Sequence, residues 1–205
     1  MTILSVNKTR ELDGRYCAHF LFMGADCAYF SFSGGNPMRK NTRFVVYAAV
    51  LAALYVVLTH VQNLLIPDSA TWAIQYRASE ALCVMALFTP AAIPGLALGC
   101  MLFNFTYAQA LPLDFVVGSL ATLLACGAMY LTRNFKVRGF PALALVMPAL
   151  FNAVLVGWEL TVYIGGGFFV NAVSVAIGEL AVLFTLGSLL YFAICRRGLE
   201  KRLFA

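Results

Sequence analysis

Long apolar stretches separated by short polar segments make up nearly all of the chain after its first 37 residues. Most of these stretches approach the roughly 20 residues that a helix needs to cross the hydrocarbon core of a bilayer. Helices are expected because a bilayer offers no water to backbone polar groups. The pattern predicts six spans, over residues 44–66, 72–88, 91–107, 113–131, 141–164 and 168–195.

The distribution of charge predicts how these spans are oriented. Of the 205 residues 62% are hydrophobic, and the net charge is +5. Lys and Arg gather before the first span, between the fourth and fifth, and after the sixth. Because cytoplasmic loops are enriched in Lys and Arg, we expect an all-α integral membrane protein, a bundle of six transmembrane helices with both termini in the cytoplasm. Topology thus explains the basic residues, and nucleic acid is not an expected partner.

Residues 1–37 differ from the rest because they are mixed polar and aromatic and have no clear helical or strand period. Two interpretations are open. The segment is a disordered cytoplasmic extension, or it is not translated and the protein starts at Met38. We favour the second, because Met38 opens a basic lead-in to the first span. In either case we expect residues 38–205 to form one membrane-embedded domain of six helices.

A second group of polar residues lies inside the spans, mostly away from the basic ends. An ionisable residue at the centre of a span costs about 3 kcal/mol, so it usually faces the bundle interior or a wet cavity. Asn152 and Glu159 fall roughly 20° apart around one helix. We therefore predict a pocket open to the outside. Its candidate binding residues are Trp72, Gln75, Arg77, Glu80, Asn104, Asn152, Trp158, Glu159, Asn171 and Glu179.

Some of these positions also have a purely structural interpretation. Arg77 and Glu80 lie one turn apart and can pair with each other. Asp114, at the start of the fourth span, can be an acid favoured by the helix dipole. Trp72 and Trp158 can belong to an interfacial aromatic belt. The sequence leaves both interpretations open at all five positions.

Catalytic, metal and nucleotide-binding motifs are missing from the sequence. It has no Walker A loop, HExxH, GxSxG or His/carboxylate cluster. We therefore expect neither an enzyme nor a metal or other cofactor. The six cysteines form no CxxC pair and are expected to be buried thiols.

Small residues spaced four apart, which let helix backbones approach closely, occur in the first and third spans. Packing within the bundle is the default explanation for this spacing. The residues are Ala48, Ala49, Ala52, Ala53, Gly95 and Gly99.

Five segments resemble a known family in sequence and in order. The QueT family comprises membrane-embedded substrate-binding (S) components of energy-coupling factor (ECF) transporters for queuosine precursors, and the resemblance covers about residues 38–197. The segments that carry it are QYRASEAL (75–82), FTPAAIPGLALG (88–99), DFVVGSLATLLA (114–125), FNA (151–153) and GEL (178–180).

The resemblance implies an S component in the plasma membrane of a prokaryote that captures a 7-deazaguanine, such as preQ1 or queuine, from outside. Its partners would be a transmembrane T component and two cytoplasmic ATPases. Ala48, Ala49, Ala52 and Ala53 would then form the surface that docks the T component. The alternatives are an S component for another small vitamin-like compound, or a small membrane-embedded enzyme.

Overall fold

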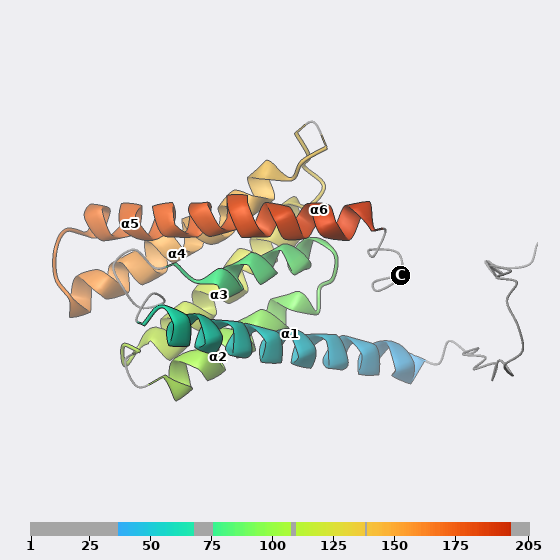
Figure 1. The fold of residues 1–205 in the computed structure, drawn as a ribbon, viewed down its shortest axis with the longest axis horizontal. Coiled ribbons are helices and arrows are strands. Elements are labelled where there is room, and N and C mark those ends of the chain that lie inside the picture. The colour runs from blue at the N-terminus through green and yellow to red at the C-terminus, as the bar shows by residue number, and fades with distance from the viewer. Residues whose placement is uncertain (1–36, 68–75, 108–109, 138, 198–205) are drawn as a thin grey trace, which may run out of the picture. The chain divides into compact units, whose positions relative to one another are not determined.

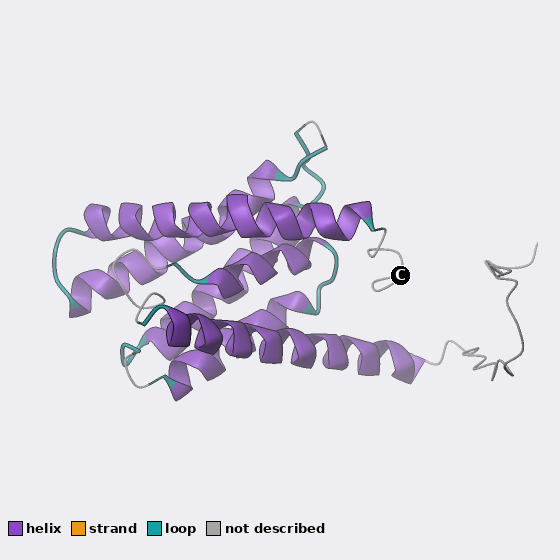
Figure 2. Ribbon diagram, in the orientation of Figure 1, coloured by secondary structure: helices purple, strands orange, loops and turns teal. Residues whose placement is uncertain are grey.

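The computed structural model describes residues 37–67, 76–107, 110–137 and 139–197. The predicted extension at residues 1–36 lies outside this part of the chain, as do the candidate residues Trp72 and Gln75. Apart from an isolated bridge between Val137 and Phe140, the regular structure described is entirely helical (Figure 2). The elements are α1 (Pro37–Leu65), η1 (Ala78–Leu87), α2 (Ala92–Thr106), α3 (Asp114–Thr132), α4 (Ala142–Tyr163), α5 (Phe168–Val182), η2 (Leu183–Gly187) and α6 (Ser188–Arg196).

The all-helical architecture predicted from the apolar pattern is confirmed. Four helices are long and apolar enough to cross a membrane, and they lie at Asn41–Leu65, Asp114–Thr132, Ala142–Tyr163 and Phe168–Arg196. The last of these comprises α5, η2 and α6, in which η2 is a π-helical turn inside an otherwise continuous helix (Figure 1). The cytoplasmic location of both termini stays a prediction.

The second and third predicted spans, 72–88 and 91–107, differ from the sequence-based expectation, because the helices described there, η1 and α2, have 10 and 15 residues and are shorter than the four long ones. Arg77 has extended backbone, with φ −104° and ψ 104°, and the ten residues after it form a 3-10 helix, η1. At about 2.0 Å per residue, such a helix is roughly 20 Å long, short of the roughly 30 Å hydrocarbon core. The side chain of Gln62 explains the late start. It donates to the carbonyl of Tyr76 and accepts from the amide of Ala78 at 2.6 Å, so these groups need no helix.

The short helix η1 lies at the centre of the bundle. It packs against every other helical element described, while α1, α2, α3, α4 and α5 pack against one another in chain order. In Figure 1 it is the green ribbon between α1 and the α5–α6 helix. Its buried residues include Cys83 and Val84, which join Tyr55, Leu96 and Phe103 in the main hydrophobic core. The position of η1 is therefore set by all of its neighbours.

Helices α1 and α2 approach closely through small residues. A Cβ atom built on Gly95 would lie 2.6 Å from the carbonyl oxygen of Ala48, and one on Gly99 would lie 2.9 Å from that of Ala52. Real Cβ atoms essentially never come this close, so only glycine fits at both positions. The small-residue spacings of the first and third spans thus pack against each other.

This contact changes the predicted docking surface. Ala48 and Ala52 are only 9% and 7% exposed because α2 covers them. Ala49 and Ala53 are exposed on the outer face of α1. Of the four alanines, the structure therefore leaves Ala49 and Ala53 available to a partner.

Replacing Gly95 with Ala should destabilise the bundle. The added methyl group meets the backbone of α1, and overpacking of this kind costs about 1–3 kcal/mol. Thermal unfolding in detergent should show a lower midpoint than the wild type. Gly127→Ala is the matched control, because a Cβ on Gly127 has nothing within 4 Å. Equal midpoints for the two variants would contradict the α1–α2 contact.

Candidate functional site

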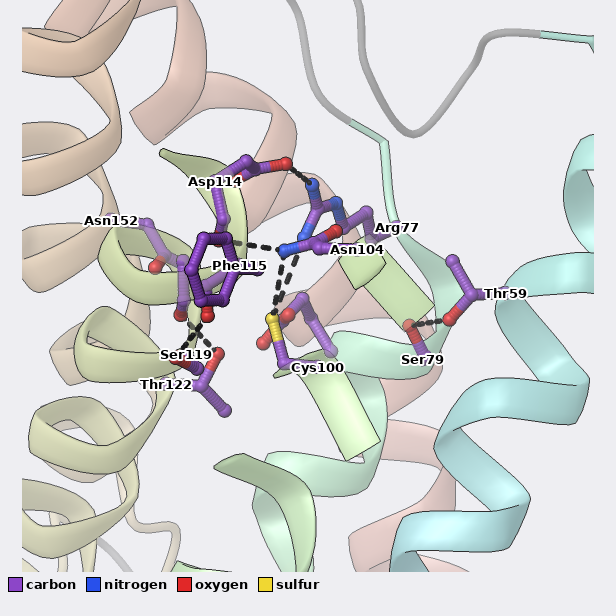
Figure 3. A network of polar contacts seen from close by, with 12 residues as sticks. Thr59, Arg77, Ser79, Cys100, Asn104, Asp114, Phe115, Ser119, Thr122 and Asn152 are labelled. Carbon is purple, nitrogen blue, oxygen red and sulfur yellow. Dashed lines mark hydrogen bonds and ion pairs between the residues drawn. The ribbon is translucent and has the colours of Figure 1, made fainter. Parts of the chain in front are cut away.

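A buried ion pair joins the entrance of η1 to the start of α3. Arg77 Nη2 lies 2.9 Å from Asp114 Oδ2, and both side chains are 4% exposed. The pair joins two elements, in place of the Arg77–Glu80 pair within one helix that the sequence allowed. Asp114 is the first residue of α3, as the dipole interpretation expected. The guanidinium group also approaches Cys100, with Nη1 3.7 Å from Sγ (Figure 3).

The carboxylate of Glu80 has hydrogen bonds at both of its oxygens. The hydroxyl of Tyr55 donates to Oε1 at 2.5 Å, and the thiol of Cys83 donates to Oε2 at 3.1 Å. A second bond between the same two elements runs from Thr59 to Ser79, at 2.7 Å. These contacts fix η1 against α1, so Glu80 has a structural role in the unliganded bundle. Its contact with a substrate stays a prediction.

On the other side of the bundle, a hydrogen bond joins α4 to α5. Asn152 Nδ2 donates to Glu179 Oε1 at 2.7 Å. The other oxygen of Glu179 is buried and has no hydrogen-bond partner among the described residues. Glu159 lies seven residues after Asn152 on the same face of α4 and is 0% exposed. Neither of its oxygens has a hydrogen-bond partner among the described residues. The prediction that Asn152 and Glu159 face the interior is confirmed.

Asn104 and Asp114 hold further unpaired oxygens where α2 meets α3. Asn104 Nδ2 donates to the backbone carbonyl of Asp114 at 2.9 Å, while Oδ1 of each side chain is buried and unpaired among the described residues. Gly118 allows this arrangement, because a Cβ there would lie 2.8 Å from Asp114 Oδ1 and 3.0 Å from Asn104 Nδ2. Sequence reasoning missed Gly118. The available signal was its position one helical turn after Asp114.

These acidic groups form one electrostatic cluster. The charges of Asp114 and Arg77 act on Glu159, and those of Glu80 and Arg77 act on Glu179. The described part of the cluster thus sets four carboxyl groups against one guanidinium. A buried acceptor oxygen left without a hydrogen bond costs about 1–3 kcal/mol. The arrangement favours a ligand that brings several N–H donors and a positive charge.

Two predicted binding residues have other positions. Trp158 is 51% exposed on the outside of α4, although Glu159 beside it is buried, because neighbouring residues diverge by about 100° around a helix. The aromatic-belt interpretation fits Trp158 better than stacking on an enclosed ligand. Asn171 donates to Thr161 Oγ1 and to the Gly165 carbonyl, both at 3.1 Å, and so closes the α4–α5 loop.

Metal coordination finds no support in the part of the chain that the structure describes. No group of three or more His, Cys, Asp or Glu side chains there is arranged to hold a metal ion. The paired groups around Arg77 and Glu80 are explained by hydrogen bonds and one ion pair. The polar interior is therefore a candidate site for an organic ligand.

The outer surface completes the description of the class. Large apolar side chains such as Val50, Leu150 and Val173 are exposed on the long helices, whereas the charged side chains Arg77, Glu80, Asp114, Glu159 and Glu179 lie inside. This distribution is the reverse of a soluble protein and suits contact with lipid. Fold and burial together define an integral membrane protein with ionisable and polar side chains in its interior.

Similarity to known proteins identifies the family within this class. The chain belongs to the QueT family, because the family model described as QueT transporter matches residues 45–196. A relative from Lactococcus lactis subsp. cremoris (strain MG1363), named Queuosine precursor transporter QueT, is 31% identical over 156 residues. That alignment covers 72% of this chain and 90% of the relative. No solved structure gives a significant match.

Replacing Asp114 with Asn should strongly destabilise the fold, because the buried guanidinium of Arg77 loses the carboxylate that it contacts. Breaking a buried pair in this way costs about 3–5 kcal/mol. The measurement is the free energy of unfolding in detergent micelles. The double variant Arg77→Gln with Asp114→Asn should recover part of the loss, since no unpaired charge remains. A single Asp114→Asn variant as stable as the wild type would contradict the ion pair.

Proposed function

We propose that this chain is the substrate-capturing S component of an ECF importer and that its substrate is a queuosine precursor. Membership of the QueT family supports the assignment, as does the name of the Lactococcus lactis relative. The observation that carries the proposal is a set of buried acceptor oxygens that have no hydrogen-bond partner among the described residues, on Asn104, Asp114, Glu159 and Glu179.

The chemistry of a 7-deazaguanine complements these oxygens. Its N1–H and exocyclic amine are adjacent donors, which one carboxylate accepts with two parallel hydrogen bonds. Glu159 is the residue suited to this pair, because both of its oxygens are unpaired. Glu179 has one oxygen bound by Asn152 and one left for a further donor. The oxygens of Asn104 and Asp114 serve the remaining edges of the ligand.

The excess of carboxyl groups over cations among the described residues favours a cationic precursor. Four buried carboxyl groups face one guanidinium in the described cluster. PreQ1 carries an aminomethyl group that is protonated at neutral pH, whereas the nitrile of preQ0 offers only an acceptor at that position. A positively charged substituent therefore compensates the site, and we expect preQ1 to bind more tightly than preQ0.

Transport requires partners in this proposal, because the sequence carries no nucleotide-binding motif. A T component and two ATPases would supply the coupling to ATP hydrolysis. The exposed pair Ala49 and Ala53 on α1 is the proposed docking surface, since small side chains let a partner helix approach closely. On its own, the chain captures substrate without releasing it across the membrane.

Replacing Glu159 or Glu179 with Gln should weaken preQ1 binding. Each change removes a charged acceptor, and hydrogen bonds to charged groups contribute about 1.5–3 kcal/mol, or a factor of about 10–100 in Kd. Calorimetric titration of the purified protein with preQ1, preQ0 and queuine measures the effect. Trp158→Leu is the control and should leave Kd unchanged, because Trp158 is exposed on the outside of α4. Unchanged affinity in both Gln variants would remove these acids from the site.

Enlarging the two exposed alanines of α1 should separate the chain from its partners without altering ligand binding. The double variant Ala49→Leu with Ala53→Leu blocks close helix contact, and co-purification of the T component and ATPases should fall. The matched control enlarges two other exposed positions on α1, Leu54→Phe with Val61→Leu. If the alanine variant recovers the partners as well as the control does, α1 docks through another face.

A further inference from the structure

A hollow of about 170 Å³ lies at the opposite end of the bundle from the carboxylate cluster. It forms where the end of η1, the α3–α4 loop, the start of α4 and α6 meet. The ligand site described above uses none of its residues. They are Leu87, Phe88, Arg133, Asn134, Lys136, Pro141 and Tyr191.

The charged groups of this hollow are all basic. Arg133 and Lys136 line it, no acidic residue of the described segments does, and Asn134 adds an amide donor. The guanidinium of Arg133 lies over the ring of Tyr130, 3.7 Å from its centre. This contact restrains the side chain, so less freedom is lost when the guanidinium binds an anion. The hollow therefore presents two positive charges in a restrained arrangement.

Its depth corresponds to a membrane surface. Helix α3 has 19 residues and a length of about 30 Å, so Asp114 and Arg133 at its two ends lie near opposite faces of the hydrocarbon core. Aromatic side chains surround the hollow, as is typical of the membrane–water interface. Phe88 and Phe140 contact Tyr191 with ring centres 5.8 and 6.0 Å apart.

Apolar and basic side chains alternate in the loop beside the hollow. Phe135 and Val137 are largely exposed on either side of Lys136. Apolar side chains at this depth enter the boundary between headgroups and acyl chains, while the cations stay at the level of the phosphates. The loop thus suits a lipid whose headgroup is held by the hollow.

We propose that this hollow binds the phosphate group of an anionic phospholipid such as phosphatidylglycerol. The guanidinium of Arg133 donates two hydrogen bonds to the phosphate oxygens, Lys136 adds a second charge, and the Asn134 amide donates a further hydrogen bond. A water takes up about 30 Å³ in the liquid, so the space accommodates a phosphate group. Basic hollows between helices are known recognition sites for such headgroups.

Native mass spectrometry of the full chain, released from nanodiscs of phosphatidylglycerol and phosphatidylcholine, tests the proposal. Wild-type protein should retain phosphatidylglycerol in preference to phosphatidylcholine. The variant Arg133→Gln with Lys136→Gln should retain it at least about tenfold less, a difference of one decade in Kd. The variant Arg196→Gln with Arg197→Gln removes the same charge from exposed positions outside the hollow and should behave as the wild type.

The outcomes separate the possible sources of the phosphate. Competition by glycerol 1-phosphate would assign the same hollow to a soluble phosphate compound, and its failure to compete assigns it to the lipid. Equal lipid retention by the two double variants would overturn the site. So would an Arg133→Gln/Lys136→Gln protein that keeps the lipid but loses co-purifying subunits, because the cations would then serve an acidic protein surface. Calorimetry with preQ1 on the same variants should show unchanged affinity, which keeps this test independent of the proposed function.

Discussion

The ion pair between Arg77 and Asp114 is the interaction on which the arrangement of the bundle depends, because a guanidinium enclosed by apolar helices has no water to solvate it. The carboxylate of Asp114, at hydrogen-bonding distance, stabilises the charge at that position. The requirement fixes the extended residue that precedes η1 against the start of α3, and so directs η1 into the middle of the helices. Once η1 is there, Glu80 reaches Tyr55 on α1, and the opposite wall is left to Glu159 and Glu179. Arg77 is thus paired with Asp114 on one side of the bundle, while Glu159 and Glu179 on the other side keep oxygens without partners among the described residues.

These oxygens are a feature of the unliganded protein. Buried carboxylate oxygens without partners are rare in folded proteins, because each raises the free energy of the folded state. Among the described residues they belong to three side chains from three helices, Asp114 on α3, Glu159 on α4 and Glu179 on α5. A site of this kind selects ligands by the hydrogen bonds that its acceptor oxygens still require. It disfavours ligands whose edges carry acceptors and favours those with donors, independently of how closely their shapes fit.

Apolar length predicted most of the fold, because the long spans are continuous in sequence and need no tertiary information. It was wrong for η1, where Gln62 replaces a turn of helix by binding the backbone near Arg77, a contact between segments that no local pattern contains. Helical periodicity predicted correctly that Glu159 is buried, because an ionisable side chain in a membrane span usually faces the bundle interior. The same logic could not place Trp158, because an indole suits either the interface or a pocket. The partners of Arg77 and of Ala48 were likewise decided by packing between helices.

The π-helical turn η2 has a consequence for how the two ends of the molecule communicate. Glu179 and Tyr191 are twelve residues apart, so in a regular α-helix they would point about 120° away from each other. A π turn takes up one additional residue, which reduces this divergence to roughly 20° and brings both side chains to the interior. Glu179 in the candidate ligand site and Tyr191 in the basic hollow therefore lie on the same face of one continuous helix. Any event that converted η2 to regular α-helix would rotate α6 relative to α5 about the helix axis. The five residues of η2 therefore set which side chains of the two ends face the same direction.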